Sequence, residues 1–188
     1  MKKTLLAVSV IIMSIACQQK AKKSSTDVDK EIKEIVNKTP GINAGSDTYT
    51  IEAPDGWGKV DTNFSGMRTT ILRSKQEGSN DNFIENITVV TQKVNDFDAE
   101  KYFNANVAEM KAQMPGFEKQ TDKAVDINGV KGYNMVYSHS YTGTPIDVDA
   151  YFLVKNDIGY VITCSAAKGK LNQWKPAFER IVNTFVIH

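Results

Sequence analysis

The chain has 188 residues, 41% of them hydrophobic, and its 23 Lys and Arg residues nearly balance its 22 Asp and Glu residues. This length accommodates a leader and one domain that is large enough to bury a hydrophobic core. Two of the lysines, Lys2 and Lys3, lie in the leader, so the rest of the chain carries 21 basic against 22 acidic residues, and nucleic acid is not an expected partner.

The first residues have the pattern of a bacterial signal peptide. Two lysines precede an uncharged, mostly apolar segment of 12 residues, Leu5 to Ala16, which is too short to cross a membrane as a helix. The segment ends in "SIAC", which resembles the bacterial lipobox, where the cysteine is acylated and becomes the first residue after cleavage. The sequence therefore predicts a signal peptide over residues 1–16, cleavage between Ala16 and Cys17, and a lipid anchor on Cys17.

This anchor predicts a protein of the cell envelope, attached to the outer membrane and facing the periplasm or the cell surface. The lipobox pattern prefers Leu at the position of Ser14, however, and Ser14 with Ala16 also fits the small-residue rule of ordinary signal peptidase. A secreted protein in which Cys17 is exposed but not acylated is therefore the alternative.

Residues 17–47 are predicted to form a tether between the anchor and the domain, because their first part, "QQKAKKSSTD", is polar and lysine-rich. Four apolar residues within the tether recur at helical spacing: Val28, Ile32, Ile35 and Val36. This pattern predicts a short amphipathic helix over residues 28–38. Packing on the domain, lying on lipid and transient helicity are all consistent with it.

The domain is expected over residues 48–188, where the pattern changes to strands and turns. Runs rich in β-branched and aromatic residues predict strands at "YTIEA" (49–53), "GMRTTILRS" (66–74) and "FIENITVVTQKV" (83–94). A turn at "PDG" follows the first strand, since Pro54 presets φ and Gly56 tolerates a positive φ.

Helical periodicity replaces alternation after the third strand. Asp96 or Asp98 is a suitable N-cap for a helix that ends before Pro115. The apolar stripe of this helix consists of Phe103, Val107, Met110 and Met114. Met and Phe at helical spacing are usually core residues, so the stripe is expected to pack against the sheet.

Four further strands are predicted in succession, joined by three hairpin turns. Asn128–Gly129 is the strongest turn signal, and "TGTP" (142–145) and "NDIG" (156–159) mark the other two turns. Strands joined in this way are antiparallel. The last of the four contains Cys164, which is expected to be a small core residue.

A second helix is predicted at the end of the chain. Its apolar side carries Leu171, Trp174, Phe178, Ile181 and Val182. Pro176 is compatible with the helix only if the helix begins near Asn172, so that the proline lies in the opening turn. About six to seven strands and two long helices predict an α+β domain, in which the helices cover a mostly antiparallel sheet.

Three of these motifs together resemble a known family. They are "P-x-G-W" at Pro54, Gly56 and Trp57, the hairpin motif with Asn128 and Gly129, and a terminal motif with Trp174 and Phe178 that ends at Phe185. Their combination is similar to the PsbP-like family, in its bacterial lipoprotein branch (DcrB-like), over residues 48–187. The resemblance implies an α/β/α sandwich around a central antiparallel sheet.

The resemblance also implies a protein that contacts another macromolecule through a sheet face or a tether, since the family is not established as one of conventional enzymes. We therefore expect a non-enzymatic, lipid-anchored envelope protein that binds or scaffolds a partner protein, without a cofactor. The histidine-based metal sites of plant PsbP are not expected here, because the chain has only His139 and His188.

The residues themselves argue against ordinary catalysis. His139 lies between Ser138 and Ser140 on a predicted strand, where alternation directs both serine side chains away from it. No Gly-x-Ser-x-Gly motif is present, and a hydrolytic triad needs a histidine within reach of a nucleophile. His139 is therefore expected to be structural or exposed.

Two groups of carboxylates are candidate ligand or metal residues. Asp147 and Asp149 project from the same face of a strand, and Asp81 and Glu85 lie in an oxygen-rich loop suited to a hard cation. Neither group matches the spacing of an EF-hand loop.

The favoured interpretation is that Asp147 and Asp149 form the solvated side of a strand whose Val148, Ala150 and Phe152 face the core. The alternative is an envelope protein that binds a small ligand or Ca²⁺ in a pocket between sheet and helix. The two aspartates would line that pocket together with Tyr133, Tyr137 and Tyr151.

Overall fold

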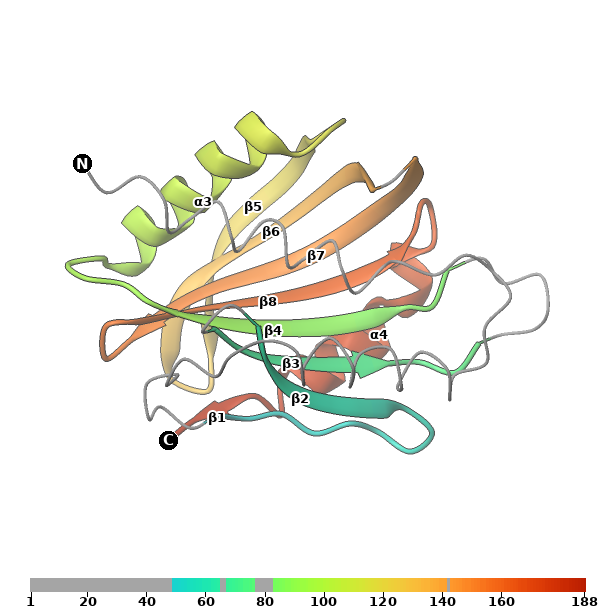
Figure 1. Cartoon of the computed structure of the whole chain (residues 1–188), viewed down its shortest axis with the longest axis horizontal. Helices are drawn as coiled ribbons and strands as arrows, with labels where there is room; N and C mark the ends of the chain where they lie inside the picture. Colours follow the sequence, from blue (N-terminus) through green and yellow to red (C-terminus); the bar gives the residue numbers. More distant parts are fainter. Residues whose placement is uncertain (1–48, 65–66, 77–82, 142) are drawn as a thin grey trace.

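The structure, a computed structural model, describes residues 49–64, 67–76, 83–141 and 143–188. Seven strands form one antiparallel sheet in the order β2-β3-β4-β8-β7-β6-β5 (Figure 1). The strands are β2 (Gly58–Phe64), β3 (Met67–Arg73), β4 (Asn86–Lys93), β5 (Glu118–Ile127), β6 (Val130–Tyr141), β7 (Thr144–Lys155) and β8 (Ile158–Ala167). The predicted antiparallel sheet is therefore confirmed.

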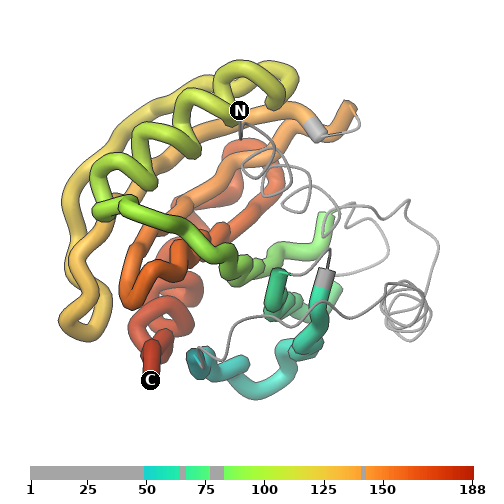
Figure 2. Tube along the Cα trace, turned by 60° about the vertical axis from the view of Figure 1, so that its left-hand side comes forward, coloured from blue at the N-terminus to red at the C-terminus, as the bar shows by residue number. Residues whose placement is uncertain are grey.

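One helix covers each face of this sheet. α3 (Ala99–Gln113) packs on β6 and β7, and α4 (Leu171–Val182) packs on the opposite face against β8 and β7 (Figure 2). This arrangement is the predicted α/β/α sandwich, but the helices have 15 and 12 residues and are shorter than the long helices expected. Among the described residues, no helix is long and apolar enough to cross a membrane.

The first predicted strand does not join the main sheet. Instead β1 (Tyr49–Thr50) pairs with β9 (Val186–Ile187), so the two ends of the domain meet in a separate two-stranded sheet. The edge strand β2 was not predicted from the sequence. It contains Gly, Asp and Asn, residue types that are depleted in strands, and among the described strands it pairs only with β3.

Local signals place the predicted turns and caps. The Asp98 side chain accepts a hydrogen bond of 2.8 Å from the Lys101 amide and so caps α3. Asp98 is one of the two residues that the sequence predicted as the N-cap. In the β5–β6 hairpin, Asn128 and Gly129 have φ values of 50° and 83°, which are the positive angles of a type I′ turn. α4 begins at Leu171, and Pro176 lies inside it, beyond the opening turn.

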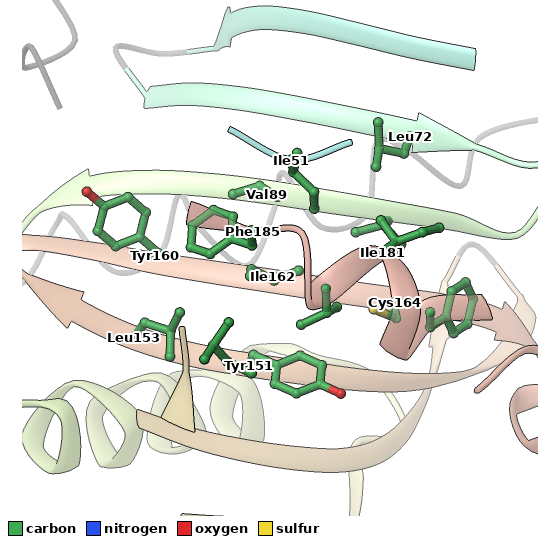
Figure 3. Close-up of a cluster of buried hydrophobic side chains, with 14 of the residues drawn as sticks. Ile51, Leu72, Val89, Tyr151, Leu153, Tyr160, Ile162, Cys164, Ile181 and Phe185 are labelled. Carbon is green, nitrogen blue, oxygen red and sulfur yellow. The ribbon is translucent and has the colours of Figure 1, made fainter. Parts of the chain in front are cut away.

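The two faces of the sheet bury two separate cores. On the α4 side, Tyr160, Ile162 and Cys164 of β8 pack with Ile181 and with Phe185 (Figure 3). Cys164 is fully buried and its burial raises the pKa of the thiol well above its ordinary value, in agreement with the predicted core role. The α3-side core contains the buried members of the predicted stripe, Phe103, Met110 and Met114.

Candidate functional site

The motifs near the start and the end of the domain meet around α4. The Trp57 ring lies 6.0 Å from the Trp174 ring and 6.4 Å from the Phe178 ring, with edge-to-face geometry in both pairs. The turn that presents Trp57 is closed by its amide, which donates to the Pro54 carbonyl at 3.0 Å, and Gly56 adopts a φ of 83°. These motif residues therefore hold α4 on the sheet.

The hairpin motif fixes the segment that follows α4. The Asn128 side-chain amide donates to the carbonyls of Asn183 (3.0 Å) and Phe185 (2.8 Å). Phe185 in turn packs against the rings of Tyr49 and Tyr160, with centroids 5.3 and 5.8 Å away. The motif residues that carry the family resemblance are thus structural in this domain, and the candidate sites lie elsewhere.

Asp147 and Asp149 are buried, with exposed fractions of 7% and 2%, so the interpretation that they form a solvated side of β7 is wrong. Val148 and Phe152 do face the core under α3, as expected, but the aspartates face α4. Alternation of polar and apolar residues along a strand indicates a solvent-exposed face only when one face of the sheet is uncovered. β7 is covered on both faces.

Asp147 anchors the turn that leads into α4. Its Oδ2 accepts a hydrogen bond of 2.7 Å from the Gly169 amide, and its Oδ1 lies 3.0 Å from Nζ of the half-exposed Lys168. The N-cap residue of α4, Lys170, makes no side-chain cap. A carboxylate at this position complements the positive end of the helix dipole, so Asp147 has a structural role at least.

Asp149 is the more deeply buried carboxylate. The Asn134 side-chain amide donates to its Oδ1, and the Tyr151 hydroxyl donates to its Oδ2 at 3.3 Å. Burial raises the pKa of Asp149 above its ordinary value, and the hydrogen bond from Asn134 and the charge of Lys175 oppose this change only in part. Burial and the neighbouring Asp149 also raise the pKa of Tyr151.

A small cavity of about 120 Å³ lies beside the two aspartates. It is lined by Gln120, Val136, Asp147, Asp149, Gly169, Leu171, Asn172 and Lys175. Its size suits a small cationic group such as an ammonium and is below that of ordinary drug-sized pockets. Within the described ranges, no three His, Cys, Asp or Glu side chains gather as metal ligands.

The burial of Asp149 predicts a change in stability with pH. The pKa of Asp149 is raised in the folded state. Its carboxyl therefore contributes most to the free energy of unfolding below the unfolded-state pKa of about 4, and this contribution is lost as the pH rises. We expect Asp149→Asn to be at least as stable as the wild type at pH 7. We also expect it to lack the part of the pH dependence of stability that comes from Asp149. Urea unfolding of both proteins between pH 4 and 7.5 measures the difference.

The difference between the two proteins isolates Asp149 from other titrating groups. His139 would contribute a slope of opposite sign in both proteins, because burial lowers its pKa and stability is lost as the pH falls. If the stability difference between Asp149→Asn and the wild type did not change with pH, the raised pKa of Asp149 would be wrong.

The remaining predicted ligand residues do not join this cavity. Tyr133 pairs with Phe152 and faces α3, as does Tyr137, whereas Tyr151 faces α4 beside the aspartates. The expected pocket of three tyrosines and two aspartates therefore does not form, because neighbouring positions of a strand point to opposite faces. Glu85 is buried ahead of β4, and Asp81 lies outside the described residues.

His139 lies in the α3-side part of the sheet and has the structural role that the sequence predicts. It is 5% exposed, and its ring stacks on Tyr137 with centroids 5.8 Å apart. Burial lowers its pKa, so the imidazole is neutral at pH 7.

A larger surface feature, which was not predicted, lies at one end of the molecule. Two open hollows of about 600 and 540 Å³ adjoin each other and share Asp98, Ala99 and Lys131. We call their combined surface the hairpin groove; it is lined by Phe97–Glu100 before and in α3, by Ala124–Asp126 and Asn128–Tyr133 of the β5–β6 hairpin, and by Val154–Asp157 at the β7–β8 turn. Figure 1 shows these three segments together at the left-hand end.

The hairpin groove combines an apolar floor with an acidic rim. Half-buried Phe97, Tyr133 and Val154 lie in it, on the α3 side of the sheet, and the Tyr133 ring is held by stacking on Phe103 with centroids 4.9 Å apart. The ionisable residues of its lining are Asp98, Glu100, Asp126, Asp157, Lys131 and Lys155, four acids against two bases. The groove therefore favours a ligand that is apolar in part and carries positive charge.

No family model and no curated protein matches the chain. Several solved structures are similar to it, among them the following three. PA94, a Pseudomonas aeruginosa protein of unknown function, is 17% identical with a TM-score of 0.58, over 76% of this chain and 97% of PA94. LpqN, involved in cell envelope biogenesis of Mycobacterium tuberculosis, is 20% identical with a TM-score of 0.61, over 80% of this chain and 86% of LpqN.

The third similar structure is the cyanobacterial PsbP, CyanoP, from Synechocystis sp. PCC 6803. It is 16% identical with a TM-score of 0.52, over 80% of this chain and 97% of CyanoP. Identities of this size establish a shared fold and leave function open. The chain therefore has the PsbP-like fold, which its motifs predicted.

Proposed function

We propose that this chain is a non-enzymatic, lipid-anchored protein of the bacterial cell envelope, which binds a partner protein through the hairpin groove. The signal peptide and the "SIAC" sequence support the envelope location, and the likeness to LpqN agrees with it. The observation that carries the binding function is the groove itself, an open concave surface built from three segments of the described domain.

The shape and chemistry of the groove favour a polypeptide. It is open along the surface, so an extended or helical segment can lie in it without entering the protein. Its apolar floor and charged rim have the arrangement of a protein interface, in which buried apolar contacts are surrounded by polar groups. Because acids outnumber bases, the partner segment is expected to carry Lys or Arg beside its apolar residues.

The walls of the groove are held in place before a partner binds. Asp98 caps α3, and the Gly129 amide of the hairpin turn donates to Asp126 at 2.7 Å. The turn is also bound to the end of the domain through Asn128. A preformed surface loses less conformational entropy on binding, so this groove can bind without rearrangement.

Affinity capture from detergent-solubilised envelope tests the proposal. Ala124→Arg places a long, positively charged side chain in the groove, where it competes for space and repels a basic segment. We expect it to reduce recovery of the partner at least tenfold, which corresponds to about 1.4 kcal/mol. The matched control is Thr121→Arg, at an exposed position on the same strand outside the groove.

Two results would contradict groove binding. An equal loss in Ala124→Arg and Thr121→Arg would indicate a general effect of charge on the edge strand. Unchanged recovery with Ala124→Arg, in a protein whose melting temperature matches the wild type, would show that the partner binds elsewhere.

A second candidate function is the binding of a small cationic ligand or Ca²⁺ in the cavity beside Asp147 and Asp149. Its support is the burial of two carboxylates in the wall of one cavity. A ligand that binds only the folded state raises the melting temperature. Stabilisation of the wild type but not of Asp149→Asn by Ca²⁺ or by a small amine would favour this function over the first.

A further inference from the structure

Small side chains form a continuous patch on part of the α3-side face of the sheet. We call it the threonine face; its residues are Thr69 and the larger Ile71 on β3, Thr88 and Val90 on β4, and Thr163 and Ser165 on β8. The strand register makes them neighbours, since Thr69 pairs with Val90 and Thr88 pairs with Thr163. Figure 2 shows α3 above the β5–β7 side, with β2–β4 away from it.

The threonine face needs a covering layer that α3 does not supply. Its side chains are between 1% and 8% exposed, although the contacts of α3 are mainly with β6 and β7. The hydroxyl of Thr88 is buried without a hydrogen-bond partner in the described part of the chain. A layer beside α3 would complete the sandwich over β8, β4 and β3, as α3 does over β6 and β7.

We propose that the chain's own segment 28–38 docks on the threonine face as a helix. Its apolar stripe, Val28, Ile32, Ile35 and Val36, has the spacing of one helix face, and its other face carries Lys and Glu. Thr, Ser and Val are short, so they let a helix with β-branched residues approach the sheet closely. The stripe of the segment and the part of the sheet that α3 does not cover are thus complementary in size.

The connection to the described domain is long enough for this position. Tyr49 lies beside β3 on the α4 side, where its hydroxyl is 2.7 Å from Thr70 Oγ1 and its carbonyl accepts from Arg68. Only the edge strand β2 separates β3 from the rim of the sheet. A path around β2 is on the order of 20 Å, and the ten residues 39–48 span at most about 35 Å.

Docking would change how the anchor holds the domain, and it does not depend on the proposed partner. A free tether from Cys17 to residue 48 has an r.m.s. reach of about 30 Å, whereas the part before residue 28 reaches about 18 Å. The domain would therefore stay nearer the membrane and in a narrower range of orientations. The hairpin groove, at the β5–β6 end, would stay uncovered.

Disulfide trapping in the purified full mature chain tests the docking. With Thr88→Cys as the fixed partner, Ile32→Cys should form an intrachain disulfide at least tenfold faster than Glu34→Cys, which lies on the opposite helix face. Peptide mass spectrometry after mild oxidation identifies the bond, and the native Cys164 is fully buried and serves as an internal control. Equal rates for Ile32→Cys and Glu34→Cys would refute a docked helix.

Maleimide labelling of Thr88→Cys alone gives a second readout that does not need a new disulfide. We expect labelling to be at least tenfold faster when Val28, Ile32 and Ile35 are all replaced by Ser, because the covering helix is lost. Equal labelling in both chains would overturn the proposal. Slow labelling in both chains would also overturn it, because something other than the segment would then cover the face. Dilution would identify a second copy of the chain as the cover, and intact mass would identify a co-purifying partner.

Discussion

Replacement of Phe178 by Ala should lower the free energy of unfolding by about 3–5 kcal/mol, the usual loss for a fully buried aromatic residue. Phe178 is completely buried, and its ring packs against Trp57 and Trp174. The variant would leave a cavity where the first and last motifs of the domain meet. Urea unfolding at pH 7, followed by circular dichroism, gives the difference directly.

The control for this prediction is Gln173→Ala, an exposed position on the same helix, which should change stability by no more than about 0.5 kcal/mol. A double-mutant cycle with Trp57→Ala should also give a coupling of about 0.5–1.5 kcal/mol, because the two rings are in contact. A loss below 1 kcal/mol for Phe178→Ala would show that α4 is not held through this aromatic cluster.

Replacement of Cys17 by Ser should release the protein from the membrane fraction almost completely. A thioether-linked lipid cannot form on serine, and the anchor of several acyl chains is the only attachment that we propose. Intact mass of the wild-type mature chain should show a diacylglycerol and an acyl group on Cys17, and the variant should lack both. Membrane fractionation and mass spectrometry of both proteins measure this effect.

Ser14→Leu is the matched control for the anchor, because it brings the sequence closer to the lipobox pattern and should keep the lipid mass. An unmodified Cys17 in the wild type would instead support cleavage by ordinary signal peptidase. Retention of Cys17→Ser in the membrane fraction to the same extent as the wild type would contradict Cys17 as the attachment point.

The fold was predictable where short-range signals agree with the tertiary structure. The Asn128–Gly129 turn, the Asp98 cap and the apolar stripe ending at Met114 each depend on a few neighbouring residues, and the structure uses all three as predicted. The PsbP-like motifs were predictable for a related reason. They are the residues that fasten the ends of the domain to the sheet, so their types are constrained by packing.

The candidate sites were less predictable, because their environment is set by residues far away in the chain. Alternation along β7 separates Asp147 and Asp149 from Val148 correctly, but it cannot show that α4 covers the aspartates. The edge strand β2 was missed for a different reason. Its composition is poor for a strand, and its pairing with β3 compensates for weak intrinsic propensity.

The hairpin groove has no signal of its own in the sequence. It forms because the start of α3, the β5–β6 hairpin and the β7–β8 turn meet at one end of the sandwich. Each of these segments is predictable as a turn or a helix start. Their juxtaposition follows from the strand order, which places β7 between β8 and β6.

The most direct test of the central claim, that the groove binds a partner protein, is photocrosslinking in living cells. A photoreactive amino acid at Lys131, which lines both hollows, should give an adduct with one envelope protein. The same amino acid at Lys123, exposed on the neighbouring strand and outside the groove, should give none. Adducts of equal yield at both positions, or none at Lys131, would contradict partner binding through the hairpin groove.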